Sequence, residues 1–361
     1  MADIPILSQL PLFSEDQWPP HKAENKANLH TYWRYRDRLP AGAQDCPTVF
    51  RLLDLFGPLD WAHFPDRNLE RNWGQQQIPY AALTAAELIR LEQGQHSTSD
   101  LHLFLCEHPS LIPLLGLHLV PAPRHPLGFN PQASLPTTRH LDRMLRQMPN
   151  AAARFLLADS VRLILAELAS RQVAPPQAIS LDTKHILAWV KENNPKAYIK
   201  NRFNKAHQPP GDPDCRLGCK RRRNQGPPDG TPTRNPVSVT GHTMGEFYWG
   251  YASGTIVAKI PGLGEFVIAE LTQPFDQADQ TYFFPLMRQA EDHLGYRPLF
   301  GAFDAAFDAW YVYAYFYRDS DPTHGMAAVP FVAKGGYGEG TRQFDPTGLP
   351  LCRAGLAMRL H

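Results

Sequence analysis

The stretch 178–185 (AISLDTKH) is the part of the sequence on which the fold assignment depends. Ile179 and Leu181 supply the apolar body of a short buried strand, and Asp182 comes where we expect this strand to give way to a loop. The preceding Pro175-Pro176 pair closes a helix, because proline cannot continue a helix and restricts the residue before it. The stretch therefore predicts a strand that ends by presenting one carboxylate.

A second stretch of the same form lies far downstream, at 297–304 (RPLFGAFD), and ends in Asp304. Carboxylates at the ends of neighbouring strands can hold a hard divalent cation, because Mg²⁺ prefers oxygen ligands. Asp182 and Asp304 are therefore the candidate catalytic residues and the candidate ligands of Mg²⁺ or Mn²⁺. An Asp after a strand is also a common turn former or helix cap, and for either acid alone this alternative stays open.

Length and composition limit the kinds of protein that this chain can be. A chain of 361 residues with 43% hydrophobic residues is long enough for two or three globular domains. No run approaches the roughly eighteen apolar residues of a membrane helix, and the N-terminus lacks the pattern of a signal peptide. The five scattered cysteines argue against a disulfide framework. We expect a cytoplasmic, nucleoid-associated protein without a membrane partner.

The net charge of +1 says little about partners, but the distribution of charge says more. Between positions 191 and 223, ten basic residues stand against three acidic ones. This segment predicts a phosphate-facing surface, although a solvated loop is the alternative. Its densest part is the run Lys220, Arg221, Arg222 and Arg223. Lys184, two residues after Asp182, has the same two interpretations.

The first half of the chain predicts helices. Residues 1–74 form an irregular N-terminal segment with short helices at 29–38 and 48–55. Residues 75–174 form a helical domain, with apolar residues at three- and four-residue steps from Tyr80. Its fourth helix, up to Met148, carries Arg139 and Arg143 on its polar faces. Such a series is compatible with a DNA-binding helical domain or with an ordinary bundle.

The second half, residues 175–361, predicts an α/β domain in a chain that is α+β overall. Strand-like runs at 247–251, 255–259 and 266–271 form a β-meander around a Gly-rich turn. A helix up to Leu294 leads into the strand that ends at Asp304. A helix over 305–317 and a strand over 329–333 complete a mixed sheet, with the basic insertion at about 191–236 between its first strands.

Six blocks of this sequence, taken in chain order, resemble the DDE transposases of bacterial insertion sequences, of the IS4-like kind. The blocks are 108–116 (HPSLIPLLG), 135–141 (LPTTRHL), 180–184 (SLDTK), 211–220 (GDPDCRLGCK), 247–251 (FYWGY) and 303–308 (FDAAFD). The resemblance implies a helical DNA-binding domain followed by a ribonuclease H-like catalytic domain. It also implies cleavage and strand transfer at the DNA ends of the element, with terminal inverted repeats and target DNA as partners, and a homodimer.

The family needs a third acid, a Glu on a helix after the last core strand. Glu339 and Asp345 lie in loop-like sequence, so the resemblance implies an incomplete ribonuclease H-like domain in a truncated copy. The alternatives are a DNA-binding remnant without catalysis and a nuclease of the same fold. Asp308 is expected to cap or face solvent on the helix after Asp304. A zinc site of Cys215 and Cys219 with His207 and His242 is disfavoured, because the cysteine spacing is C-x₃-C.

Overall fold

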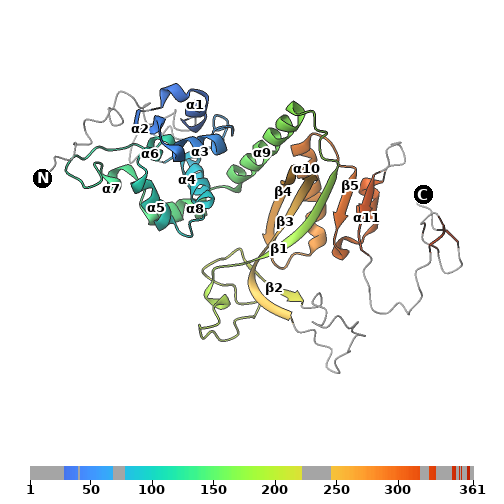
Figure 1. Cartoon of the computed structure of the whole chain (residues 1–361). Coiled ribbons are helices and arrows are strands. Elements are labelled where there is room, and N and C mark those ends of the chain that lie inside the picture. Colours follow the sequence, from blue (N-terminus) through green and yellow to red (C-terminus); the bar gives the residue numbers. More distant parts are fainter. Residues whose placement is uncertain are drawn as a thin grey trace, which may run out of the picture.

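The computed structural model describes residues 28–39, 41–67, 78–221, 245–317 and 325–330, with short pieces between 344 and 357. The first half is helical (Figure 1). Its elements are α1 (Asn28–Arg34), η5 (Arg36–Arg38), α2 (Ala41–Gln44), α3 (Pro47–Phe56), α4 (Tyr80–Glu92), α5 (Thr98–Glu107), α6 (Leu111–Leu114), α7 (Pro131–Ser134), α8 (Thr138–Gln147) and α9 (Asn150–Ser170). Within the described residues, each helix is too short or too polar to traverse a bilayer.

Capping side chains mark the first turns of α5 and α8. Ser97 and Asp100 form a reciprocal capping box at the start of α5, in which each side chain accepts a bond from the other residue's backbone N–H. Thr137 caps α8 by accepting the backbone N–H of His140. These bonds satisfy backbone donors that have no partner inside a helix.

The helical half has one core. Leu29, Trp61 and Phe64 are buried in the same cluster as residues of α4, α5, α6 and α8 and Ala152 of α9. The expected boundary at 74/75 therefore does not separate two cores, because the aromatic side chains before it pack under the later helices. The sequence pattern did not predict a core shared across position 74, since Trp and Phe spaced irregularly among prolines carry no helical period.

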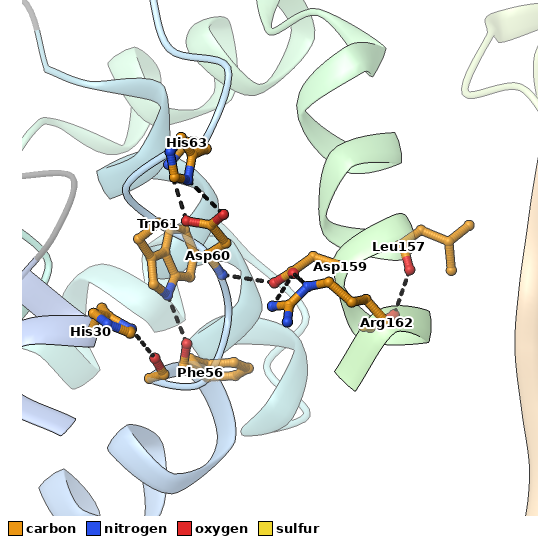
Figure 2. Close-up of polar contacts among 10 residues, drawn as sticks. His30, Phe56, Asp60, Trp61, His63, Leu157, Asp159 and Arg162 are labelled. Atoms are coloured by element: carbon orange, nitrogen blue, oxygen red, sulfur yellow. Dashed lines mark hydrogen bonds and ion pairs between the residues drawn. The ribbon is translucent and has the colours of Figure 1, made fainter. Parts of the chain in front are cut away.

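Helix α9 lies between the helical group and the sheet (Figure 1). Ala152 belongs to the helical core, whereas Val161 is fully buried in the core of the sheet half. Between them Asp159, buried at 6% exposure, accepts the backbone N–H of Asp60 at 2.7 Å and the guanidinium of Arg162 at 2.7 Å (Figure 2). This one helix therefore ties the loop after α3 to both cores.

Within the described residues, the second half forms a six-stranded mixed sheet. Its elements are β1 (Ala178–Leu187), η6 (Lys191–Asn193), β2 (Arg216–Arg221), β3 (Gly245–Ile260), β4 (Gly264–Pro274), η8 (Asp279–Tyr282), α10 (Phe283–Leu294), β5 (Phe300–Phe303), η9 (Ala305–Phe307), α11 (Trp310–Phe316) and β6 (Met326–Ala328). β3 runs antiparallel to β1, and both β2 and β4 run antiparallel to β3. β5 runs parallel to β1, and β6 parallel to β5. The expected α/β character is therefore present.

Several element boundaries differ from the expected ones. β1 does not end at Asp182 but continues to Leu187, because β3 pairs with it over this whole length. The two strand-like runs before residue 260 form the single strand β3. The helix expected over 305–317 is split into η9 and α11, because Asp308 leaves the helical conformation with a ψ of 80°. β6 lies before the expected strand at 329–333, whose last three residues are outside the described part.

One face of the sheet is covered by α10. Leu286, Met287 and Ala290 of this helix are fully buried in the same cluster as Ile256 and Ala258 of β3. The helix and the preceding η8 approach β3 closely at Gly254, where a Cβ atom would lie 2.5 Å from the ring of Tyr282. The Tyr282 hydroxyl donates to the backbone carbonyl of Ala252 at 2.7 Å, which fixes η8 above the strand. The absence of a side chain at Gly254 therefore allows η8 to pack closely against β3.

Candidate functional site

The parallel pairing of β1 with β5 brings Asp182 and Asp304 to neighbouring positions. The ladder runs from Ala178↔Phe300 to Leu181↔Phe303. Asp182 is the next residue of β1, and Asp304 is the first residue after β5. Adjacent strands lie about 4.8 Å apart, so the two backbones meet at the carboxyl end of this ladder. The sequence predicted the acids at strand ends. The prediction is correct for Asp304, because β5 ends at Phe303. For Asp182 only the pairing with β5 ends at the preceding residue, and β1 itself continues to Leu187.

Asp304 is held by the turn that follows it. Its carboxylate accepts the backbone N–H of Ala306 at 3.0 Å and so caps η9. Partial burial of the carboxyl raises the pKa of Asp304, and the nearby carboxylates of Asp279 and Asp182 raise it further. The bond from Ala306 works in the opposite direction but does not cancel these effects. The capping interpretation and a catalytic role are thus both compatible with this carboxylate.

Asp279 is a third acid at this end of the sheet, and the sequence pattern did not predict it. It begins η8 and accepts the hydroxyl of Thr183, the residue after Asp182, at 3.0 Å. Gln280 of the same turn donates to the backbone carbonyl of Ala306 at 3.2 Å, so η8 bridges β1 and η9. The available signal was the polar run 276–281 (DQADQT) between a strand and an apolar helix, which is also typical of a surface loop.

The described residues contain no group of three or more His, Cys, Asp or Glu side chains arranged to hold a metal ion. Glu270 faces the same side of the sheet as Asp182, through the register Asp182↔Thr255↔Glu270, but lies two strands away, at about 10 Å. It also accepts the hydroxyls of Ser253 and Thr272. The carboxylates that could together offer oxygen ligands to a divalent cation are therefore those of Asp182 and Asp304, at the end of the β1–β5 ladder.

Of the other acids that the sequence analysis named, Asp308 and Asp345 accept hydrogen bonds from partners close to them in the chain. Asp308 follows η9 and accepts the hydroxyl of Tyr313 at 2.9 Å, so it is not on the helix where we expected it. Asp345 forms a local turn in which its carboxylate accepts the backbone N–H of Leu349. Glu339 lies outside the described residues.

The cysteines do not form a metal site in the described residues. Cys215 is fully buried just before β2, and its thiol donates to the backbone carbonyl of Asp212 at 3.2 Å. Burial, and then the charge of Asp212, raise the pKa of this thiol to about 11. Cys219 lies four residues along an extended strand, about 13 Å away, so the two sulfurs cannot share one ion. His207 is exposed, and His242 is outside the described residues.

The basic residues predicted to contact DNA occupy different elements. Arg139 and Arg143 are exposed on α8, and the Arg143 guanidinium donates to His140 at 2.8 Å. Lys184 is exposed on β1, on the same strand face as Asp182. Lys220 and Arg221 belong to β2, and Arg222 and Arg223 lie outside the described residues.

Comparison with known proteins found no family model, no curated protein and no solved structure that matches this chain.

Proposed function

We propose that this chain acts on DNA as a DDE-type transposase that cleaves and joins the ends of its own element. The observation that carries the proposal is the β1–β5 register, which sets Asp182 and Asp304 side by side at the carboxyl end of a parallel ladder. A ribonuclease H-like mixed sheet with two acids in these positions is what the motif resemblance implies. The antiparallel β1, β3 and β4 followed by the parallel β5 and β6 support this finer fold assignment.

The chemistry follows from the charges. DNA cleavage and strand transfer are in-line displacements at phosphorus, and Mg²⁺ supplies activation of the attacking hydroxyl and neutralisation of the leaving oxygen. Asp182 and Asp304 would hold the cation, and their mutual repulsion would be relieved by it. Thr183 and Asp279 would keep β1 and η8 in register beside them. Lys184, exposed on the same strand face as Asp182, would bind a phosphate of the DNA.

The proposal is tested with labelled DNA from both flanks of the reading frame, incubated with the full chain and Mg²⁺. The expected result is cleavage at discrete sites and joined products, which fall by on the order of a thousandfold or more in Asp182→Asn and in Asp304→Asn. Cleavage of arbitrary duplexes or of RNA–DNA hybrids would instead indicate a nuclease. Specific binding of the flanks without any cleavage would indicate a DNA-binding protein that lacks catalysis.

A second readout does not depend on activity. Mn²⁺ binding, followed by the loss of the free-ion magnetic resonance signal, should weaken in both Asp→Asn variants. Asp308→Asn is the matched control, because it removes a nearby carboxylate that already accepts the Tyr313 hydroxyl. Equal Mn²⁺ affinity in all three variants would contradict the assignment of the acids as metal ligands.

A further inference from the structure

The segment between β1 and β2 presents two aromatic rings to solvent. Trp189 is 101% exposed and Tyr198 is 97% exposed, whereas large aromatic side chains usually bury most of their surface. Leu187, two residues before Trp189 at the end of β1, is also exposed. Since the described fold leaves these rings without packing partners, they fit a ligand with an apolar face.

The backbone that carries these rings is anchored. Asn193 donates to the backbone carbonyls of Ala188 and Trp249 at 2.8 and 2.7 Å, and accepts the N–H of Trp249 at 2.9 Å. The indole of Trp249, 1% exposed, donates to the carbonyl of Arg202 at 2.7 Å. Arg202 in turn donates to the carbonyls of Asn194 and Ala197. Hydrogen bonds therefore hold the backbone of this segment against β3, while the rings of Trp189 and Tyr198 are exposed to solvent.

The charges around these rings are mostly positive. Five exposed lysines lie on the segment or just before it: Lys184, Lys191, Lys196, Lys200 and Lys205. In the described part of the chain none of their ammonium groups forms an ion pair. Of the three acids on the segment, Asp212 accepts the Tyr251 hydroxyl at 2.6 Å, Glu192 is half-buried and Asp214 is exposed, so the lysines outnumber the exposed acid. The surface therefore combines free cations with free aromatic faces.

These two features fit one class of ligand. A DNA duplex offers phosphates to the lysines, but its bases are stacked inside the helix and present only their edges. An unpaired strand offers both phosphates and open base faces, and stacking on aromatic side chains tolerates any sequence. We propose that Trp189 and Tyr198 stack on unpaired bases of a DNA single strand whose phosphates are bound by Lys191, Lys196 and Lys200. This inference rests on the proposed function only in taking DNA as the ligand.

Binding is measured in EDTA, so that the result does not depend on cleavage. The full chain is titrated into a labelled oligothymidylate of about twenty nucleotides and into a duplex of the same length, with fluorescence anisotropy as the readout. Trp189→Ala and Tyr198→Ala should each weaken single-strand binding roughly five- to one-hundredfold. Duplex binding should change by less than about twofold. Trp189→Phe, which keeps a stacking face, should stay within about threefold of wild type.

Two further measurements separate the contributions. Lys196→Gln with Lys200→Gln should lower the slope of log affinity against log salt for the single strand by about 0.7 per lysine. Lys259→Gln is the charge-matched control, because Lys259 is 75% exposed on the distant β3–β4 hairpin beside Glu265, and it should leave the slope unchanged. Oligothymidylate should quench the tryptophan fluorescence of wild type, and Trp189→Phe should lose this quenching while it still binds.

The proposal is overturned if Trp189→Ala and Tyr198→Ala bind the oligothymidylate as tightly as wild type. It is also overturned if Trp189→Ala changes only the sedimentation of the chain, since the rings would then form a contact between copies. Because both rings are exposed, neither variant should alter the melting temperature. A chain that cleaves no DNA but passes these binding tests refutes the transposase proposal and leaves this one standing.

Discussion

At the scale of single residues, the charge of Asp304 is the most informative feature of the candidate site. Its carboxyl has a raised pKa because it is partly buried and stands near the carboxylates of Asp279 and Asp182. For an acid whose folded-state pKa is raised, the folded chain is destabilised as pH rises from the ordinary value through the raised one. This destabilisation is therefore present at neutral pH, above the ordinary carboxyl pKa, and absent in acid below it.

Asp304→Asn should therefore raise the melting temperature at neutral pH. The same substitution should remove DNA cleavage, because the proposed metal ligand is lost. Asn can still accept the Ala306 N–H and cap η9, so the stabilising bond of the turn is kept. The gain should vanish in acid below the ordinary carboxyl pKa, where the wild-type group is also neutral. Thermal melts in EDTA at neutral and acidic pH check this. A variant that melts lower than wild type at neutral pH would show that the carboxylate stabilises the fold.

Asp279 should act on Asp304 through charge. Asp279→Asn removes one of the charges that raise the Asp304 pKa, and this pKa should fall toward its ordinary value. Thr183→Val is the matched control, because it deletes the hydrogen bond to Asp279 and leaves the charge in place. Carbon-detected NMR titration of the Asp304 carboxyl measures both variants. Equal shifts in both would mean that the hydrogen bond, and not the charge, sets the pKa.

At the scale of elements, α9 depends on one buried carboxylate (Figure 2). Asp159→Ala leaves the Asp60 N–H without its acceptor, which should lower the free energy of unfolding by about 1–3 kcal/mol. Asp159→Asn keeps an acceptor and should lose less. Glu167→Ala is the control on the same helix, where the 60% exposed pair with Arg171 should contribute at most about 0.5 kcal/mol. Urea unfolding measures all three variants, and a loss in Glu167→Ala as large as in Asp159→Ala would contradict the role given to burial.

The packing of η8 against β3 requires glycine at position 254. In Gly254→Ala the new methyl group would meet the ring of Tyr282 and the side chain of Leu286, both fully buried. We expect a loss of about 1–3 kcal/mol in the free energy of unfolding, because a packed interior cannot make room for a methyl group without strain. Gly211→Ala serves as the control, since its Cβ would come no nearer than 4.0 Å to the side chain of Val190. Comparable denaturation midpoints for the two variants would refute the close approach.

The sequence predicts an element well when the interactions that form it are between residues close together in the chain. The starts of α5 and α8 have local signals, because Ser97 and Thr137 cap them through bonds within four residues. The extension of β1 past Asp182 was not readable, since it depends on pairing with β3 some seventy residues away. Asp182 and Asp304 could be found because each follows an apolar run. Asp279 could not, because only the folded η8 brings this loop residue to Thr183.

At the scale of the whole molecule, a net charge of +1 conceals two basic surfaces on different halves of the chain. One is the lysine-bearing segment after β1, and the other is the exposed face of α8. On α8 the spacing of Arg139, Arg143 and Arg146 puts all three side chains on one side of the helix. Aromatic rings accompany the lysines but not these arginines, so we expect the α8 face to contact duplex phosphates.

The double substitution Arg139→Gln with Arg143→Gln should therefore weaken duplex binding several-fold at moderate salt. It should reduce the salt slope by about 0.9 for each phosphate that an arginine no longer neutralises, while oligothymidylate binding stays near the wild-type value. Arg171→Gln removes a positive charge from the end of α9, where Glu167 already pairs with it, and should leave both affinities unchanged. Anisotropy titrations over a range of salt concentrations make the comparison. If the α8 substitutions weakened the binding of duplex and of single strand equally, the two surfaces would form a single binding site. They would then not bind paired and unpaired DNA separately.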